Sequence, residues 1–423
     1  MARLGDRTDN STASSPRARA LPYISPTALC RSYLLAASGV LLLLPVLFLG
    51  ACQDPSGVGL DVIGEEGADP RVSVVAADSV MLDDEADITG GFANSVTPTQ
   101  SRILVGATMD ALLGDASAFA YLDVFTPGEI PEGFRDRTII SATLRLVRDY
   151  VYGDSMVSVP LELHRMDSEW SPIGAPADTT FDAGALLVEA TVAATDTLVV
   201  LDLPASWVTE YDAILRSDTL AASLDGFQLR LPDGVVPGAV MGFNTMQSSL
   251  RVMTAQDTVD YPLFEVFTHI ERGTAARPPA NRIVLRDGAG ETLALTFPFN
   301  DLERQPLANA IVRLSVDPSV LDEPGFARAL PETIVLFGRT EAGERVAILN
   351  TDLDETTNSY SFSSATLTAV IQEALLERSI FERFEISVLS SSASLDAIPL
   401  IIGPEPAENE ADTRPRVALT LVP

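Results

Sequence analysis

The sequence has few of the residues on which much enzyme chemistry depends. Its 423 residues include no lysine, two histidines and two cysteines, and both cysteines, Cys30 and Cys52, lie near the amino terminus. A domain that begins after Cys52 has no thiol, which excludes a disulfide, a cysteine nucleophile and a cysteine-ligated zinc ion. The stability of such a domain must come from buried apolar surface.

The two histidines, His164 and His269, are far apart and belong to no shared motif. Neither GxSxG nor HExxH occurs, so the sequence contains no signature of a serine hydrolase elbow or a zinc protease helix. We expect His164, which follows Leu163 in a predicted strand, to be a structural or surface residue rather than a ligand or a base.

Positive charge is scarce, since 28 arginines face 59 acidic residues, a formal net charge of −31. Without the first 51 residues, which hold five arginines and two aspartates, the net charge becomes −34. Binding to nucleic acid requires clustered cations, and the same holds for anionic lipid headgroups. The composition therefore argues against both partners.

Residues 34–52 form an apolar run that ends on Leu49-Gly50-Ala51-Cys52. A positively flanked apolar segment that ends in small residues is typical of a secretory signal. A cysteine directly after it indicates a bacterial lipoprotein, with residues 1–51 removed and Cys52 acylated. A transmembrane helix is the alternative, but Pro45 and the polar sequence after Cys52 favour cleavage. Gln53 after the cysteine suggests an outer-membrane lipoprotein, facing the periplasm or the cell surface.

The rest of the chain predicts an all-β protein. Residues 52–70 are rich in Gly, Pro, Asp and Glu and are expected to be a flexible tether. From residue 71, short apolar runs alternate in the strand period and are separated by turn residues, as in 141–147 and 157–164. Residues 287–290 and 341–344 are expected to be hairpin loops. Residues 205–215 and 365–377 have a helical pattern, the second with Ser363 or Ser364 as N-cap.

An internal duplication is the most informative feature of the sequence. Residues 141–146 (SATLRL) match residues 309–314 (NAIVRL), and residues 161–165 (LELHR) match residues 335–339 (VLFGR). Each copy continues through a strand, a helix and further strands in the same order. We therefore predict two tandem jelly-roll-like β-sandwich domains related by duplication, each with one short helix, at residues 71–258 and 259–423.

The segments SATLRLV, LELHRMDSEWS, LDLPASWVTEY and GFQLRL resemble the DNRLRE-type β-sandwich domain. The exported part as a whole is similar to outer-membrane lipoproteins of Bacteroidota-like bacteria that contain a domain of unknown function. This resemblance implies jelly-roll-like sandwiches and, through carbohydrate-binding relatives, an ability to bind glycans.

Trp170, with Asp167 and Glu169 beside it, is the candidate ligand contact. A tryptophan in a loop offers a flat face for sugar stacking with a polar edge, although packing is the competing interpretation. Trp207, at the start of the first predicted helix, is expected to anchor the core. Asp167 and Glu169 are also the candidate pair for a carboxylate-dependent glycosidase or lyase, against the simpler interpretation of solvated loop charges.

Asn350, Asp352 and Asp354, with Glu355 adjacent, have the alternate spacing of oxygen ligands in a calcium loop. The glycine at position six and the bidentate acid at position twelve are missing. A structural calcium ion is one hypothesis, and an acidic hairpin end is the other. We predict no other cofactor.

These observations predict a lipid-anchored cell-envelope protein that is not an enzyme and acts as a binding module, with a glycan or polymer as its ligand. The alternative is a structural or assembly partner in an outer-membrane protein complex, where the acidic surface docks a basic protein. The lesser alternative is the carboxylate-dependent glycosidase or lyase.

Overall fold

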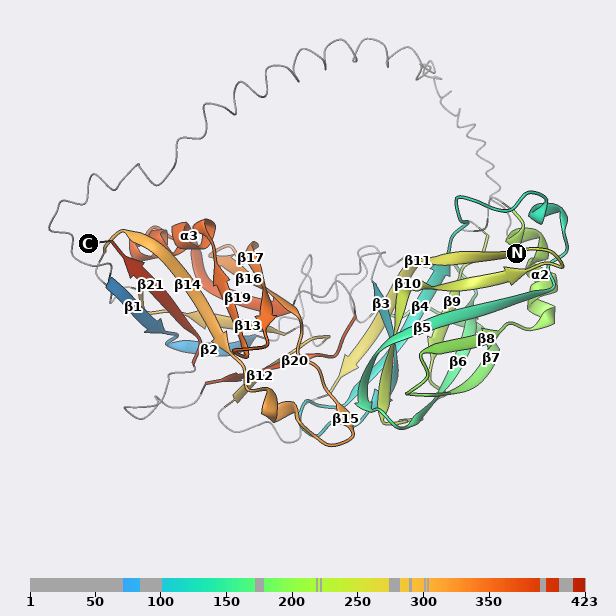
Figure 1. Ribbon diagram of the computed structural model, residues 1–423, viewed down its shortest axis with the longest axis horizontal. Helices are drawn as coiled ribbons and strands as arrows, with labels where there is room; N and C mark the ends of the chain where they lie inside the picture. The colour runs from blue at the N-terminus through green and yellow to red at the C-terminus, as the bar shows by residue number, and fades with distance from the viewer. Residues whose placement is uncertain are drawn as a thin grey trace, which may run out of the picture. The chain divides into compact units, whose positions relative to one another are not determined.

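The computed structural model confirms the all-β prediction (Figure 1). It describes residues 71–83, 101–171, 179–217, 220, 223–273, 282–288, 291–299, 302, 304–388, 393–402 and 414–422. Cys52, the predicted signal peptide and the tether lie outside these residues. Within them the strands form two large antiparallel sheets and one two-stranded ribbon, and there are two α-helices.

The first sheet collects strands from the first half of the chain, and one short strand from the second half lies at its edge. The order is β15-β5-β10-β11-β4-β9-β6-β7, with β3 paired to β10 and β4, and β8 paired to β5. The strands are β3 (Arg102–Thr108), β4 (Ala116–Val124), β5 (Ser141–Asp154), β6 (Ser158–Met166), β7 (Ala183–Ala193), β8 (Leu198–Asp202), β9 (Phe227–Arg230), β10 (Ala239–Met253), β11 (Thr258–Arg272) and β15 (Phe326–Ala327).

The second sheet has the order β1-β21-β14-β18-β17-β16-β19-β13-β2. Its strands are β1 (Arg71–Ala76), β2 (Ser79–Asp83), β13 (Thr292–Thr296), β14 (Leu307–Ser315), β16 (Thr333–Thr340), β17 (Arg345–Asp354), β18 (Ser359–Ser363), β19 (Phe381–Val388) and β21 (Arg416–Leu421). β1 and β2 stand at opposite ends of this order, yet only Ala77 and Asp78 separate them. The sheet must therefore curl until its ends meet, and it encloses a core in the manner of a sandwich.

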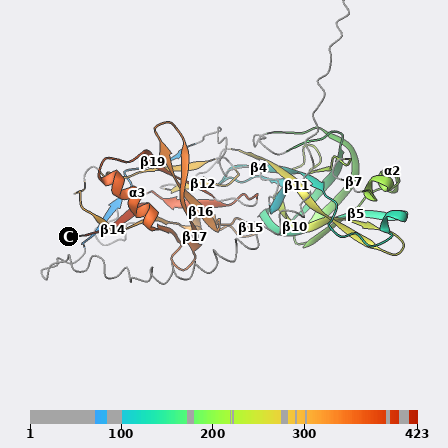
Figure 2. The same ribbon diagram turned by 90° about the horizontal axis from the view of Figure 1, so that it is seen from above.

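Strand alternation explains this core. In β14, Ala310, Val312 and Leu314 are fully buried, while the residues between them are more exposed. Helix α3 (Ala365–Leu375) closes one side of the core, and Figures 1 and 2 both show it alongside β14. The Ser364 side chain accepts a hydrogen bond from the Leu367 amide at 3.0 Å, which confirms one of the two predicted N-caps.

Helix α2 (Ala205–Leu215) matches the predicted range and contributes to the core of the first sheet. Trp207 is 2% exposed and stacks on Tyr211 with ring centroids 4.7 Å apart. The interpretation of Trp207 as a core anchor is confirmed.

The sheets cross the predicted domain boundaries. β1 and β2, assigned to a first domain at residues 71–258, pair in the second sheet, whereas β11 continues the first sheet to Arg272. The hairpin at 341–344 forms between β16 and β17. The one at 287–290 does not, because β12 (Arg282–Arg286) pairs with β20 (Ala397–Ile401). Strand patterns are local, whereas strand partners are chosen by packing across the whole fold.

Four strand pairings recur in both sheets. The pairs β5–β8, β6–β7, β6–β9 and β4–β9 of the first sheet correspond to β14–β18, β16–β17, β16–β19 and β13–β19 of the second. The helices also correspond in sequence order, because α2 lies between β8 and β9 and α3 lies between β18 and β19. The tandem duplication itself stays a prediction.

Candidate functional site

Trp170 is not an open platform for a sugar. Its side chain is 7% exposed and lies in an aromatic cluster with Tyr121, Phe181 and Phe267. The indole Nε1 donates to the Asp225 carbonyl at 2.9 Å, so the polar edge is also bound. The loop position suggested exposure, but Tyr121 of β4, Phe267 of β11 and Phe181, which precedes β7, contact the ring. Trp170 therefore packs, and the predicted stacking contact does not hold.

The two carboxylates predicted beside Trp170 face the solvent. Asp167 is 56% exposed and pairs with Arg165, with 2.9 Å between Nε and Oδ1. Glu169 is exposed as well. Since the indole lies inside and the carboxylates outside, the three residues do not form a common sugar site.

The histidines are buried and bonded. His164 is 8% exposed and contacts Glu162 Oε2 at 2.9 Å through Nε2. His269 is 4% exposed and stacks on Phe119 with ring centroids 4.5 Å apart. The position of His164 is that of a structural residue, one of the two alternatives predicted for it.

The predicted calcium ligands lie in a regular strand and its turn rather than in a loop around an ion. Asn350, Asp352 and Asp354 belong to β17. Asp352 accepts from the Thr333 hydroxyl at 2.6 Å, and Asp354 accepts from the Thr357 hydroxyl at 2.7 Å. The Thr357 bond and the Thr356 amide lower the pKa of Asp354. Across the described ranges no group of three or more His, Cys, Asp or Glu residues is placed to hold a metal ion.

Asp352 and Glu355 instead line an open hollow of about 720 Å³ in the half of the chain that forms the second sheet. The hollow lies between the short helix η6 (Pro318–Leu321), the segment that follows it, and the end of β17. Its polar lining consists of Asp322, Arg328, Glu332, Asp352, Glu355 and Asn358, and its apolar lining consists of Pro318, Leu321, Leu330 and Leu353. We call this feature the acidic hollow.

Local backbone structure places the carboxylates of the acidic hollow. The Leu353 amide donates to the Glu332 carbonyl at 2.8 Å, which ties the start of β16 to the end of β17. Asn358 has a left-handed backbone with φ of 46°, and asparagine tolerates this better than most residues. This turn returns the chain to β18 and presents Glu355 at the rim of the hollow.

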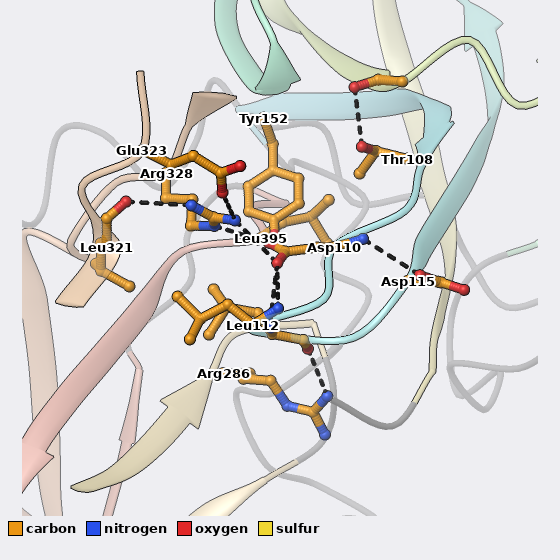
Figure 3. Close-up of polar contacts among 12 residues, drawn as sticks. Thr108, Asp110, Leu112, Asp115, Tyr152, Arg286, Leu321, Glu323, Arg328 and Leu395 are labelled. Atoms are coloured by element: carbon orange, nitrogen blue, oxygen red, sulfur yellow. Dashed lines mark hydrogen bonds and ion pairs between the residues drawn. The ribbon is translucent and has the colours of Figure 1, made fainter. Parts of the chain in front are cut away.

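Arg328 lines the acidic hollow. Figure 3 shows its guanidinium beside Asp110, which follows β3, and Tyr152 of β5. The Arg328 side chain is 2% exposed and that of Asp110 is fully buried. Arg328 Nε donates to Asp110 Oδ2 at 2.8 Å, and Nη2 donates to Oδ1 at 3.0 Å. Tyr152 donates to the same carboxylate at 2.5 Å, and Glu323 accepts from Arg328 at 2.7 Å. The cation is therefore fixed and neutralised.

The ionisation of this group follows from its contacts. Burial raises the pKa of Asp110, but hydrogen bonds from Arg328, Tyr152 and the Leu113 amide outweigh it and bring the pKa below its usual value. Burial raises the pKa of Tyr152, and the Asp110 carboxylate adds to this effect. At neutral pH the group therefore consists of a carboxylate, a guanidinium and a neutral phenol.

The arrangement can bind the charged end of a basic side chain. Four carboxylates and one neutralised arginine leave the acidic hollow strongly negative, and the leucines can cover an aliphatic chain. None of its lining residues is a histidine, a serine or an aromatic residue. The sequence pattern had pointed to Asp352 and Glu355, but Asp322, Glu332 and Arg328 were missed because they lie in an irregular segment without a motif.

No protein-family model, curated protein or solved structure matches the chain. Among the described residues no helix is both long enough and apolar enough to cross a bilayer. The fold therefore defines the protein only as all-β, and its function has to be inferred from the chemistry of its own surface.

Proposed function

We propose that the protein is a lipid-anchored component of the cell envelope that acts as a non-catalytic docking module for a basic partner protein. The observation that carries this proposal is the acidic hollow, with four carboxylates around leucine side chains. The net charge of −34 after Cys52 adds a field that attracts a basic partner. Anchoring rests on the apolar run that ends at Cys52.

The chemistry of the hollow suits the side chain of a partner arginine or lysine. The aliphatic stem of such a residue would lie against Leu330 and Leu353, while its charged head would face Glu332, Asp352 and Glu355. Single exposed ion pairs contribute only about 0.2 to 1 kcal/mol. Useful affinity therefore needs several carboxylates at once, together with the apolar contact.

Glycan binding is the competing function. Sugar sites usually contain an exposed aromatic face, but Trp170 is buried and the acidic hollow is lined by no aromatic residue. These two observations favour the protein partner over the glycan.

The test compares two variants of the full lipidated chain that differ from it by the same charge. The hollow variant carries Asp322→Asn, Glu332→Gln, Asp352→Asn and Glu355→Gln. The control variant carries Glu129→Gln, Glu132→Gln, Asp182→Asn and Glu189→Gln, all at exposed positions away from the hollow. Each protein is recovered from its own membranes after crosslinking, and its stoichiometric partners are identified by mass spectrometry.

We expect one basic partner to crosslink with the wild type and the control variant but not with the hollow variant. Equal loss in both variants would show that overall charge, and not the hollow, attracts the partner. An unchanged partner in the hollow variant would refute the proposal. Binding of a neutral glycan on an array, unaffected in the hollow variant, would support the competing function.

A further inference from the structure

The ribbon of β12 and β20 joins the two sheets. Leu285, Ile398 and Leu400 lie in the core of the second sheet, whereas Val284 and Ala397 lie in a cluster shared with residues of the first sheet. This shared cluster also contains Leu104, Leu113, Tyr152 and Val240 from the first sheet. We call the contact between the ribbon and the first sheet the junction.

Two acidic residues lie side by side at the end of the ribbon. Asp287 follows β12 and is 5% exposed, and Asp396 precedes β20. The Asp287 amide donates to the Asp396 carbonyl at 2.8 Å, which holds the two residues together. Ser394 donates to Asp287 Oδ2 and also lies within hydrogen-bonding reach of the Asp396 carboxyl.

The first sheet contributes directly to this acidic pair. Tyr150 of β5 donates to Asp396 Oδ1 at 2.9 Å and accepts from the Leu395 amide at 3.0 Å. Arg272, at the end of β11, donates through Nη2 to the Leu395 carbonyl at 2.6 Å. The charge state of the pair and the attachment of the ribbon to the first sheet therefore depend on the same few atoms.

Ser394 supplies one hydrogen atom to the acidic pair, beside the Gly288 amide, which donates to Asp287 Oδ1 at 2.8 Å, and Tyr150, which donates to Asp396 Oδ1. A serine hydroxyl carries one hydrogen, so Ser394 can donate to only one carboxyl group, and a bond to the other requires a proton on that carboxyl. The Arg272 charge favours the ionised form of both carboxyls, but its Nη2 donates to the Leu395 carbonyl, and its buried Nε and Nη1 have no hydrogen-bond partner among the described residues. Two adjacent buried charges of the same sign are costly.

We propose that Asp287 and Asp396 hold a single proton through Ser394, and that loss of this proton loosens the junction between the two sheets. Burial raises the pKa of Asp287 to about 6, and the neighbouring Asp396 adds to the rise. Burial also raises the pKa of Asp396, against hydrogen bonds from Tyr150 and Ser394 and the charges of Arg102 and Arg272. Burial raises the pKa values of Tyr150 and of Tyr360 of β18, and the Asp396 charge adds to both.

The direction of the effect follows from linkage. When the junction is open, each carboxyl titrates near its ordinary pKa of 3.8, whereas Asp287 in the closed junction titrates near 6. The closed junction therefore binds more protons between these values, so its stability falls as the pH rises from about 4 to 6 and is constant above that. The two pKa values imply that opening becomes about a hundredfold more favourable between pH 4 and pH 7.

Amide hydrogen exchange of the whole protein tests this, with peptides from residues 282–288, 393–401 and 141–154 as reporters and peptides from β14 as the internal reference. After correction for intrinsic exchange, we expect protection of the reporters to fall by about a hundredfold from pH 4 to pH 7 in the wild type. Asp287→Asn should remove most of this fall, whereas Asp233→Asn, at a side chain that is 91% exposed, should not.

A flat pH profile in the wild type, or an unchanged fall in Asp287→Asn, would overturn the proposal. Asp396→Asn provides a second variant, because it removes the other member of the pair and leaves Asp287 in place. If neither variant folds, the wild-type profile alone decides between the two outcomes. The reference peptides from β14 distinguish opening of the junction from unfolding of the second sheet.

Discussion

Replacing Asp110 by asparagine should destabilise the protein strongly, because it leaves a buried guanidinium without its main counter-ion. The Asp110 side chain is fully buried and Arg328 is 2% exposed. Asparagine can still accept from the Leu112 and Leu113 amides, which bond to Asp110 Oδ1 at 2.8 and 3.1 Å. It places an amide donor near the donors of Arg328 and Tyr152, however, and removes the charge.

The magnitude follows from the class of interaction. Removing one partner of a buried ion pair costs roughly 3 to 5 kcal/mol. Glu323 still accepts from Arg328 at 2.7 Å, although its side chain is 56% exposed, so we expect a loss near the lower end, about 3 kcal/mol. The free energy of unfolding is measured by denaturant titration at pH 7, with circular dichroism and tryptophan fluorescence as probes.

The exposed pair of Arg251 and Asp260 provides the matched control. It has two parallel contacts of 2.8 Å, but its side chains are 34% and 45% exposed. Asp260→Asn should cost less than about 1 kcal/mol. Adding Arg328→Met to Asp110→Asn should restore part of the loss, since it removes the uncompensated charge. A loss in Asp110→Asn no larger than that in Asp260→Asn would refute the reasoning.

Two further predictions concern single residues. Ser364→Ala should lower the free energy of unfolding by about 1 kcal/mol because the Leu367 amide loses its acceptor, whereas Ser364→Asp should retain most of it; equal losses in thermal melts would contradict the capping role. Burial, with help from Glu265 and Asp225, raises the pKa of Asp123 to about 7, so the folded state loses stability as the pH rises from 4 to 7. Asp123→Asn should therefore be more stable than the wild type by about 2 kcal/mol at pH 8, a value discounted for partial exposure, and no more stable at pH 3.5.

Local patterns in the sequence were enough to predict the elements. The alternation at residues 141–147 predicted part of β5, and the apolar spacing after Ser364 predicted α3 with its N-cap. The core role of Trp207 followed in the same way from its place on a short amphipathic helix. These predictions hold because hydrogen bonding within a helix and alternation along a strand depend on neighbours in the sequence.

The candidate site was less accessible to such reasoning. Trp170 lies in a loop, where the sequence suggested exposure, and it is buried by side chains that the fold brings from β4 and β11, together with Met166 and Phe181. Asp352 and Glu355 were selected for calcium from their spacing, but the structure surrounds them with Asp322 and Glu332 in an open hollow. Which acidic residues converge depends on irregular segments, and their course has no periodic signal in the sequence.

The sequence by itself determined the all-β class, the helices, the acidic charge, the absence of thiols in the chain after Cys52 and the expectation of a lipid anchor, because each depends on composition or on short-range order. Only the tertiary structure decided that β1 and β2 join the second sheet, that Arg328 meets Asp110, and that Asp287 and Asp396 meet at the junction. Asp110 and Arg328 are 218 positions apart in the chain. Such contacts form because the whole chain buries its apolar surface, and no local pattern specifies them.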